Sequence, residues 1–317
     1  MRFLRFIVIF IICTLFFTSC KNNPDVLVPP DSETDNIDTA IQTDTDSETD
    51  ALTEDLTEDT DAKDVFIMFD PDEYKQLISE IYSRPAPTGA TAITNINDLA
   101  FLCTLSAVRG DVGPIGIVPA KLESDGVIED VYLITLGGTE FKDGQATDIQ
   151  TDVLAGFGKS NDYLRAVVDT VNAQIPKNSK LFIAGLSLGG MVAQQVASEP
   201  EICNNYEIVN TMCIGSPLVI NEKSNLREGK ILRFEDSFDF VPKASIYTFN
   251  LSVMSKYSHE RISEKSDYIQ PIYAHTFSYV SSPVWKKYDA VGIENGNSTL
   301  RFNADNITYY NAPIINQ

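Results

Sequence analysis

The sequence predicts an α/β protein in which a mostly parallel sheet is covered by helices on both faces. Two observations support this. Between residues 131 and 234, short apolar runs typical of buried strands alternate with segments whose apolar residues recur at helical spacing. One apolar run, residues 181–186, is followed directly by a Gly-x-Ser-x-Gly sequence and then by a second helical segment. Strands and helices that alternate on this period indicate a largely parallel sheet.

The individual elements can be placed in chain order. We expect helices over residues 71–81 and 96–108, the first with Pro71 at an opening position. Residues 115–118 and 120–123 are candidate strands that lead into a turn at 124–126. The central region predicts strands at 131–136, 181–186, 209–214 and 230–234, and helices at 161–175 and 191–197. The polar residues 296–317 support no assignment.

The first nineteen residues have the composition of a secretory signal. Arg2 and Arg5 form a basic start, an apolar run extends to Phe17, and small residues precede Cys20. This segment resembles a bacterial lipoprotein signal. The resemblance implies removal of residues 1–19, a diacylglycerol on Cys20 and an extracytoplasmic protein anchored to the membrane. An ordinary cleaved signal or an uncleaved anchor is the alternative, and either would also place the protein outside the cytoplasm.

Residues 20–63 predict an acidic, disordered linker. From Asp31 to Asp64 there are fourteen acidic residues against the single Lys63, and apolar side chains are too few to offset the entropy of ordering. Residues 64–317 are long enough for one α/β domain with a sizeable core. The whole chain has a net charge of −21 and no basic cluster, which argues against a nucleic-acid partner.

Cysteine and histidine are too sparse to indicate a metal site. The domain contains Cys103, Cys203 and Cys213, an odd number without a Cys-x-x-Cys pair. Either Cys203 and Cys213 form a disulfide, or all three are thiols. Two histidines cannot form the common zinc clusters, so we expect neither a metal nor a cofactor.

The Gly-x-Ser-x-Gly sequence is a candidate nucleophile elbow. Gly185 and Gly189 remove side chains that would keep the strand and helix apart, and Ser187 lies at the apex of the turn. Its hydroxyl would stand clear of the sheet, and the N–H of Leu188 would point to where an oxyanion forms. The alternative is a strand–helix turn with no catalytic role.

A serine nucleophile needs a base and an acid to orient that base. The chain has two histidines, His259 and His275, and both follow Ser187. Asp236 and Asp239 follow the strand at 230–234 and are the candidate acids. The order serine, acid, histidine is that of the α/β-hydrolases.

Five ordered landmarks between residues 131 and 290 resemble the class 3 lipases, which have the α/β-hydrolase fold. The elbow is similar to the Gly-His-Ser-Leu-Gly-Gly sequence of that family, with Leu186 in place of histidine. The other landmarks are the strand at 131–136 with Gly137-Gly138-Thr139, the acidic segment 148–152 with Gly156-Phe157, Ile214-Gly215-Ser216-Pro217, and Asp239-Phe240-Val241-Pro242.

The resemblance selects among the candidate side chains. It favours Asp239 as the acid, which leaves Asp236 as an exposed loop carboxylate. It favours His275 as the base, which leaves His259 in solvent. It also implies an oxyanion hole formed by the N–H groups of Leu188 and Thr139.

The function implied by the resemblance is that of a serine carboxylic ester hydrolase, a lipase or esterase acting on acylglycerol-type lipid esters. A phospholipase, an envelope deacylase or an acyltransferase could use the same triad. A non-catalytic surface-binding domain on the same fold is the alternative from another class. We expect a monomer whose partners are a lipid or ester substrate and the membrane. The apolar residues 247–257 could form a lid or acyl pocket, or pack in the core.

Overall fold

The computed structural model describes residues 70–106, 113–138, 149–218, 230–244 and 259–312. The chain divides into two units, residues 1–63 and 64–317, and the described residues all belong to the second. The predicted signal, Cys20 and the acidic linker therefore lie outside the described residues. Within the described ranges, no helix combines the length and apolar character needed to cross a bilayer.

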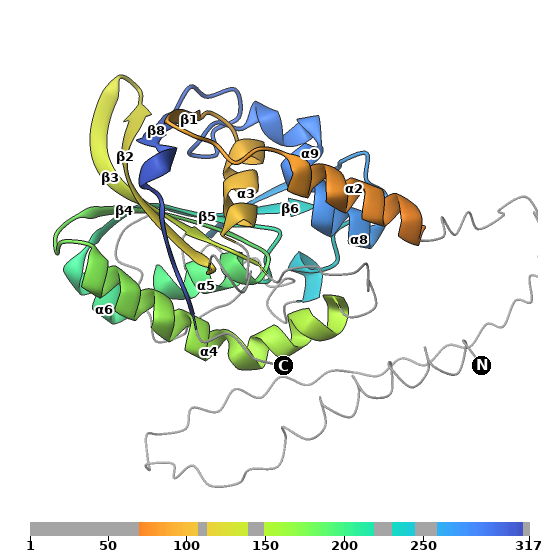
Figure 1. Ribbon diagram of the computed structural model, residues 1–317, viewed down its shortest axis with the longest axis horizontal. Helices are drawn as coiled ribbons and strands as arrows, with labels where there is room; N and C mark the ends of the chain where they lie inside the picture. Colours follow the sequence, from red (N-terminus) through yellow and green to blue (C-terminus); the bar gives the residue numbers. More distant parts are fainter. Residues whose placement is uncertain (1–69, 107–112, 139–148, 219–229, 245–258, 313–317) are drawn as a thin grey trace, which may run out of the picture. The chain divides into compact units, whose positions relative to one another are not determined.

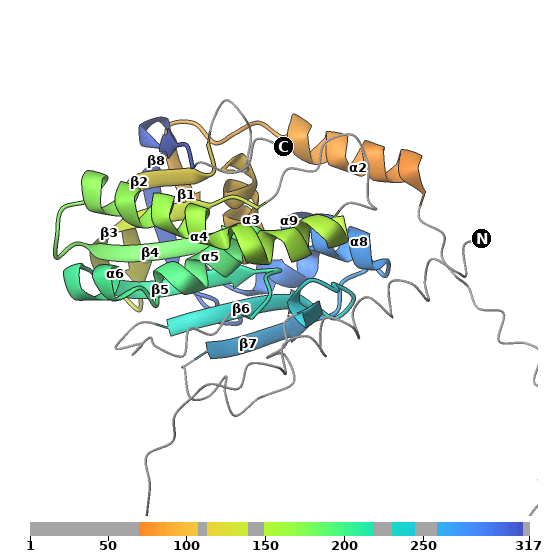
Figure 2. The same ribbon diagram turned by 90° about the horizontal axis from the view of Figure 1, so that it is seen from below.

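One sheet organises the domain, with nine strands in the described residues. Its strands follow the order β1-β8-β2-β3-β4-β5-β6-β7, and β9 pairs with β2. Strands β3 to β7 run parallel, whereas β1, β2, β8 and β9 make antiparallel pairs. The strands are β1 Ala90–Ile93, β2 Ile115–Ser124, β3 Val127–Leu136, β4 Lys180–Leu186, β5 Glu207–Ile214, β6 Lys230–Asp236, β7 His259–Glu264, β8 Thr299–Asn303 and β9 Thr308–Tyr310. Figure 2 shows β4 to β7 side by side.

The N-terminal strands differ from the sequence prediction. The two short strands expected at 115–118 and 120–123 are one strand, β2, which forms a hairpin with β3 through Asp125 and Gly126. Both turn residues have positive φ, as a two-residue hairpin loop requires. Pro119 is tolerated inside β2 because β9 pairs with 115–117 and β8 with 120–123, so Pro119 falls between the two partners. Residues 296–317, which support no assignment from sequence, supply both of these partner strands.

Helices cover both faces of the sheet (Figure 1). On one face lie α4 (Ile149–Gln174), α5 (Leu188–Val196) and α6 (Pro200–Asn205). On the other lie α2 (Pro71–Ser83) and α3 (Ile96–Leu105), together with the short C-terminal turns. Those turns are α8 Pro271–Tyr273, η2 Ala274–Ser278, α9 Tyr279–Ser281, η3 Pro283–Lys287 and η4 Ala304–Asn306, and a further short turn, η1 Pro242–Ala244, follows β6. The predicted α/β-hydrolase-like fold, with helices on both faces of a sheet whose central part is parallel, is confirmed.

Strand β4 is apolar from Leu181 to Leu186 because both of its sides are buried. Along β4, Leu181 and Ile183 pack towards α4 and α5, whereas Phe182 and Ala184 pack towards α3 and the C-terminal turns. Successive side chains of a strand point to opposite faces, so only a strand covered on both sides needs a continuous apolar run. This packing places the carboxyl end of β4, where Ser187 follows, at the edge of two well-packed cores.

Candidate active site

Ser187 lies in a strained turn between β4 and α5. Its backbone has φ 55° and ψ −119°, outside the region that non-glycine residues usually adopt. The turn is held in place because the Ser187 N–H donates a 2.8 Å hydrogen bond to the carbonyl oxygen of Ile214 at the end of β5. The strand, turn and helix that the sequence predicts are therefore present, with the serine at the apex.

The glycines of the turn are required by close backbone approach. A Cβ atom on Gly185 would lie 2.2 Å from the carbonyl oxygen of Gly189. A Cβ on Gly189 would lie 2.1 Å from the carbonyl oxygen of Leu136, at the end of β3. Both distances are shorter than any van der Waals contact, so side chains at these positions would push α5 away from the sheet.

His275 lies far from Ser187 in the sequence but contacts it in the folded domain. Its Nε2 atom lies 2.9 Å from Ser187 Oγ, although the two residues are 88 positions apart. The ring is held in η2, a π-helical turn, and packs against the ring of Phe240 with 6.1 Å between the ring centroids. Ser187 is 4% exposed and His275 is 3% exposed, so bulk water has little access to the hydrogen bond between them.

Asp239 completes the arrangement from the loop after β6. Its Oδ2 atom lies 2.9 Å from Nδ1 of His275, and its Oδ1 accepts a 2.8 Å hydrogen bond from the Val241 N–H. When Nδ1–H is donated to Asp239, a neutral imidazole turns the lone pair of Nε2 towards Ser187. The structure thus brings together Ser187, His275 and Asp239 in one chain of hydrogen bonds.

Tyr279 is a further member of this network. Its hydroxyl donates a 2.8 Å hydrogen bond to Oδ2 of Asp239 and accepts a 2.9 Å hydrogen bond from the N–H of Asp236. Burial, together with the negative charge of Asp239, raises the pKa of Tyr279 well above its usual value, so the hydroxyl keeps its proton. Tyr279 is not among the site residues predicted from the sequence. Its position four residues after His275 is the available signal, because residues i and i+4 share a helix face.

The expectation that Asp236 is exposed was wrong. Asp236 is the last residue of β6, and its side chain is fully buried on the same face of the strand as Leu232 and Phe234. The strand runs two residues further than predicted, so alternation directs Asp236 inwards rather than into a loop. Asp239, not Asp236, contacts His275, which agrees with the choice that the lipase resemblance favours.

His259 begins β7, where its backbone is in register with Ile231 near the amino end of β6. Ser187 and Asp239 lie beyond the carboxyl ends of β4 and β6. A strand rises about 3.3 Å per residue, and five residues separate Ile231 from the end of β6 at Asp236. The backbone of His259 is therefore roughly 15 Å from the carboxyl end of the sheet. Of the two histidines, His275 is therefore the one that contacts the serine.

The candidate oxyanion donors are the N–H groups of Leu188 and Thr139. Leu188 is the first residue of α5, so its N–H has no acceptor within its own helix. Thr139 lies outside the described residues. The residue before it, Gly138, packs against the elbow: a Cβ there would lie 2.8 Å from the carbonyl oxygen of Leu186 and 3.1 Å from Cβ of Ser187. The chain segment that leads to Thr139 therefore starts beside Ser187.

The helix after Ser187 is tied to the end of β5 by Gln194. Its buried Nε2 donates to the Gly190 and Pro217 carbonyl oxygens and to Ser216 Oγ, at 3.3, 2.7 and 3.2 Å. These bonds connect the elbow landmark with the Gly215-Ser216-Pro217 landmark. The two motifs, which are 25 residues or more apart in sequence, are thus held together behind the serine.

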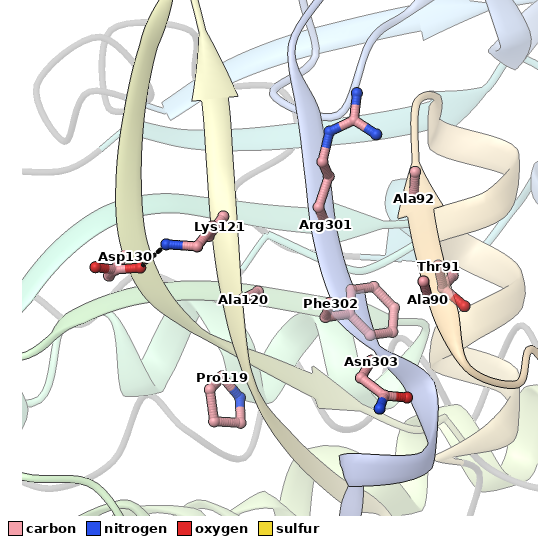
Figure 3. Close-up of a pocket in the computed structure, with 10 residues that line it drawn as sticks. All are labelled: Ala90, Thr91, Ala92, Pro119, Ala120, Lys121, Asp130, Arg301, Phe302 and Asn303. Atoms are coloured by element: carbon pink, nitrogen blue, oxygen red, sulfur yellow. Dashed lines mark hydrogen bonds and ion pairs between the residues drawn. The ribbon is translucent and has the colours of Figure 1, made fainter.

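A surface groove of about 510 Å³ lies elsewhere on the sheet (Figure 3). It is formed by residues 90–92 of β1, 119–121 of β2, Asp130 of β3 and 301–303 of β8. An ion pair between Lys121 and Asp130, with 2.6 Å between Nζ and Oδ1, crosses one side of it. None of the three side chains of the candidate active site lines this groove, so it is not where the serine would meet a substrate.

The cysteines are thiols in the structure. Cys103, Cys203 and Cys213 form no disulfide, so the Cys203–Cys213 alternative is wrong. Burial raises the pKa of both Cys103 and Cys213 to about 12. In the part of the chain that the structure describes, no group of three or more His, Cys, Asp or Glu side chains could hold a metal ion. The segment 247–257, a candidate lid or pocket wall, lies outside the described residues.

Comparison with known proteins adds little to this geometry. No protein-family model and no curated protein sequence matches the chain. A crystal structure of M37 lipase is similar to it with a TM-score of 0.32 and 12% sequence identity, over 66% of this chain and 86% of that one. A similarity of this size carries no conclusion about activity, so the function is inferred from the site itself.

Proposed function

We propose that the protein is a serine carboxylic ester hydrolase that acts through Ser187, His275 and Asp239. The observation that supports this is the unbroken series of hydrogen bonds from Ser187 Oγ through the imidazole to Asp239, with 2.9 Å at each step. A buried turn that carries strained backbone at its serine is costly, and such strain is typical of functional sites. A purely structural turn has no need of a histidine and an aspartate aligned behind the hydroxyl.

In the proposed reaction, Ser187 Oγ attacks the carbonyl carbon of the ester while His275 Nε2 removes its proton. Asp239 accepts a hydrogen bond from Nδ1–H of His275 and stabilises the imidazolium that forms. The N–H groups of Leu188 and Thr139 stabilise the oxyanion. The carbon–oxygen bond of the ester then breaks, and the alcohol leaves with the proton from His275. Water, activated by the same histidine, hydrolyses the acyl-serine and releases the acid.

The proposed substrates are acylglycerol-type lipid esters, and this part of the proposal rests on the resemblance to class 3 lipases. We further propose that the predicted lipidated Cys20 holds the domain on the outer side of a bacterial membrane. Replacing Cys20 with alanine is then expected to move the protein from the membrane fraction to the soluble fraction. A Cys20→Ala protein that stays fully membrane-bound would contradict the anchor.

The activity is tested with p-nitrophenyl esters and the Ser187→Ala variant of the full chain. Ser187→Ala is expected to lower kcat by several orders of magnitude, because the nucleophile is removed. Ser198→Ala is the matched control: Ser198 is also a buried serine, and its hydroxyl only donates to the Gln194 carbonyl oxygen within the α5 region. Equal rates for Ser187→Ala and the unaltered protein would contradict the proposal.

The substrate class is tested by comparing three esters: short-chain p-nitrophenyl acetate, emulsified long-chain triacylglycerol, and phospholipid vesicles. A preference for the emulsion over the soluble ester and the vesicles supports an acylglycerol lipase. A preference for vesicles would instead identify a phospholipase with the same triad.

A further inference from the structure

Asp236 is a buried carboxylate that the proposed reaction does not use. Its two oxygens bond in different directions: Oδ2 accepts a hydrogen bond from the Ser278 hydroxyl, and Oδ1 accepts one from the Phe238 N–H at 2.9 Å. Burying a carboxylate is costly unless its oxygens are satisfied. Because both oxygens of Asp236 are satisfied, the buried carboxylate can hold Ser278 and Phe238 at fixed positions relative to β6.

One of these partners, Ser278, lies in the same turn as His275. The π-helical turn η2 contains both residues, with Ser278 at its end. Ser278 Oγ also accepts a 2.9 Å hydrogen bond from the indole Nε1–H of Trp285, whose side chain is fully buried. Trp285, Ser278 and Asp236 thus form a buried series of bonds that runs from η3 through η2 to β6. Single π-helical turns are uncommon and often occur at functional sites, where contacts outside the turn hold them.

Asp236 also contacts the segment that carries Asp239. Its carbonyl oxygen accepts a 3.0 Å hydrogen bond from the Asp239 N–H, and its own N–H donates to the Tyr279 hydroxyl that bonds Asp239. Asp236 therefore bonds on one side to the loop of the acid and on the other to the turn of the base. Both segments are thus joined to the end of β6 through Asp236.

We propose that Asp236 is a positioning residue, which clamps η2 to the end of β6 through Ser278 and so sets His275 between Asp239 and Ser187. This inference rests on the proposed function. Asp236 touches neither the substrate nor the reacting atoms. Its role is to keep the imidazole within the short distances that proton transfer needs, where a displacement of about 1 Å can cost roughly a hundredfold in rate.

The direct test is Asp236→Asn in the full chain. The amide oxygen can still accept from the Phe238 N–H, so the NH₂ group faces Ser278; the hydroxyl must then accept this bond beside that of Trp285, and a neutral bond replaces the stronger one to a carboxylate. We expect kcat to fall about tenfold or more with KM unchanged. The rate at which a fluorophosphonate probe labels Ser187 should fall by a similar factor, because labelling needs His275 to take the serine proton but requires no substrate binding.

Ser278→Ala provides an independent variant, since it removes only a hydroxyl. We expect it to reproduce the loss of kcat. We expect Asp236→Asn combined with Ser278→Ala to be no worse than the more damaging single change, because Ser278→Ala already removes the bond that Asp236→Asn weakens, and the lost Trp285 bond is common to both proteins that carry Ser278→Ala. Fully additive losses would show that the two residues act separately and would overturn the clamp.

The matched control is Asp289→Asn. Asp289 is a buried aspartate that accepts hydrogen bonds from the N–H groups of Val291, Ile293 and Ser298, and it contacts none of the three site residues. It should lose stability but keep kcat per folded molecule. If Asp236→Asn behaves in the same way, Asp236 is merely structural and the inference is wrong. Activity that survives Ser187→Ala would instead overturn the proposed function, so the two failures are distinguishable.

Discussion

Removing one hydroxyl tests how Asp239 is held. In Tyr279→Phe the ring keeps its packing against Gly215 and Trp285, whereas the donor to Asp239 and the acceptor of the Asp236 N–H both disappear. A hydrogen bond to a charged group is worth about 1.5–3 kcal/mol. Asp239 retains two other donors, His275 Nδ1 and the Val241 N–H, so we expect the lower end, about 1.5 kcal/mol. That corresponds to a loss of about tenfold in kcat.

The assay is ester hydrolysis in a double-mutant cycle with Asp239→Ala. Because Tyr279 acts through Asp239, Tyr279→Phe should cost about tenfold in the unaltered protein and almost nothing when Asp239 is already absent. The loss should also be constant between about pH 6 and 9, since the pKa of Tyr279 lies well above its usual value and the hydroxyl stays protonated.

Tyr206→Phe is the matched control for the loss of a buried hydroxyl. The Tyr206 hydroxyl donates to the carbonyl oxygens of Val171 and Ile175, which belong to the α4 region and are not part of the site. It should lower stability without changing kcat. An equal loss from Tyr279→Phe in both Asp239 backgrounds would refute the coupling between the two residues.

Three further predictions concern the elbow and the core. Gly189→Ala should lower the free energy of unfolding by about 2–3 kcal/mol and abolish activity, because its Cβ would meet the Leu136 carbonyl oxygen at 2.1 Å. Urea unfolding measures this, and Gly89→Ala, which adds backbone strain at φ +60° but meets no atom within 4 Å, is the control that lacks the steric clash. Cys103 and Cys213 should resist iodoacetamide at neutral pH until the protein unfolds, since burial raises both thiol pKa values to about 12; peptide mass mapping would show early labelling if this is wrong. Trp285, the single tryptophan, is fully buried, so its fluorescence emission should shift to longer wavelength on unfolding, and an unchanged maximum would contradict its burial.

The parts of the site that could be predicted from sequence are those set by local geometry. A strand, a tight turn and a helix need small residues at fixed spacing, so Gly185, Ser187 and Gly189 identify the elbow without reference to the rest of the chain. The central strands could be predicted for a similar reason, because burial on both faces requires an apolar run. The pairing of Asp239 with His275 followed from chain order and the lipase resemblance, and the structure places these two side chains 2.9 Å apart.

The sequence by itself thus determined the class of fold, the elbow and a short set of candidate acids and bases. Tertiary structure alone decided that Asp236 is buried, that Ser278 and Trp285 link it to η3, and that Tyr279 bonds Asp239. The contacts of Asp236 with Ser278 and of Asp239 with Tyr279 join residues about 40 positions apart, across the end of β6 and a π-helical turn. It also decided that residues after 296 return to pair with β1 and β2. No local pattern encodes such contacts, because they depend on how the sheet aligns distant segments rather than on the propensity of any one of them.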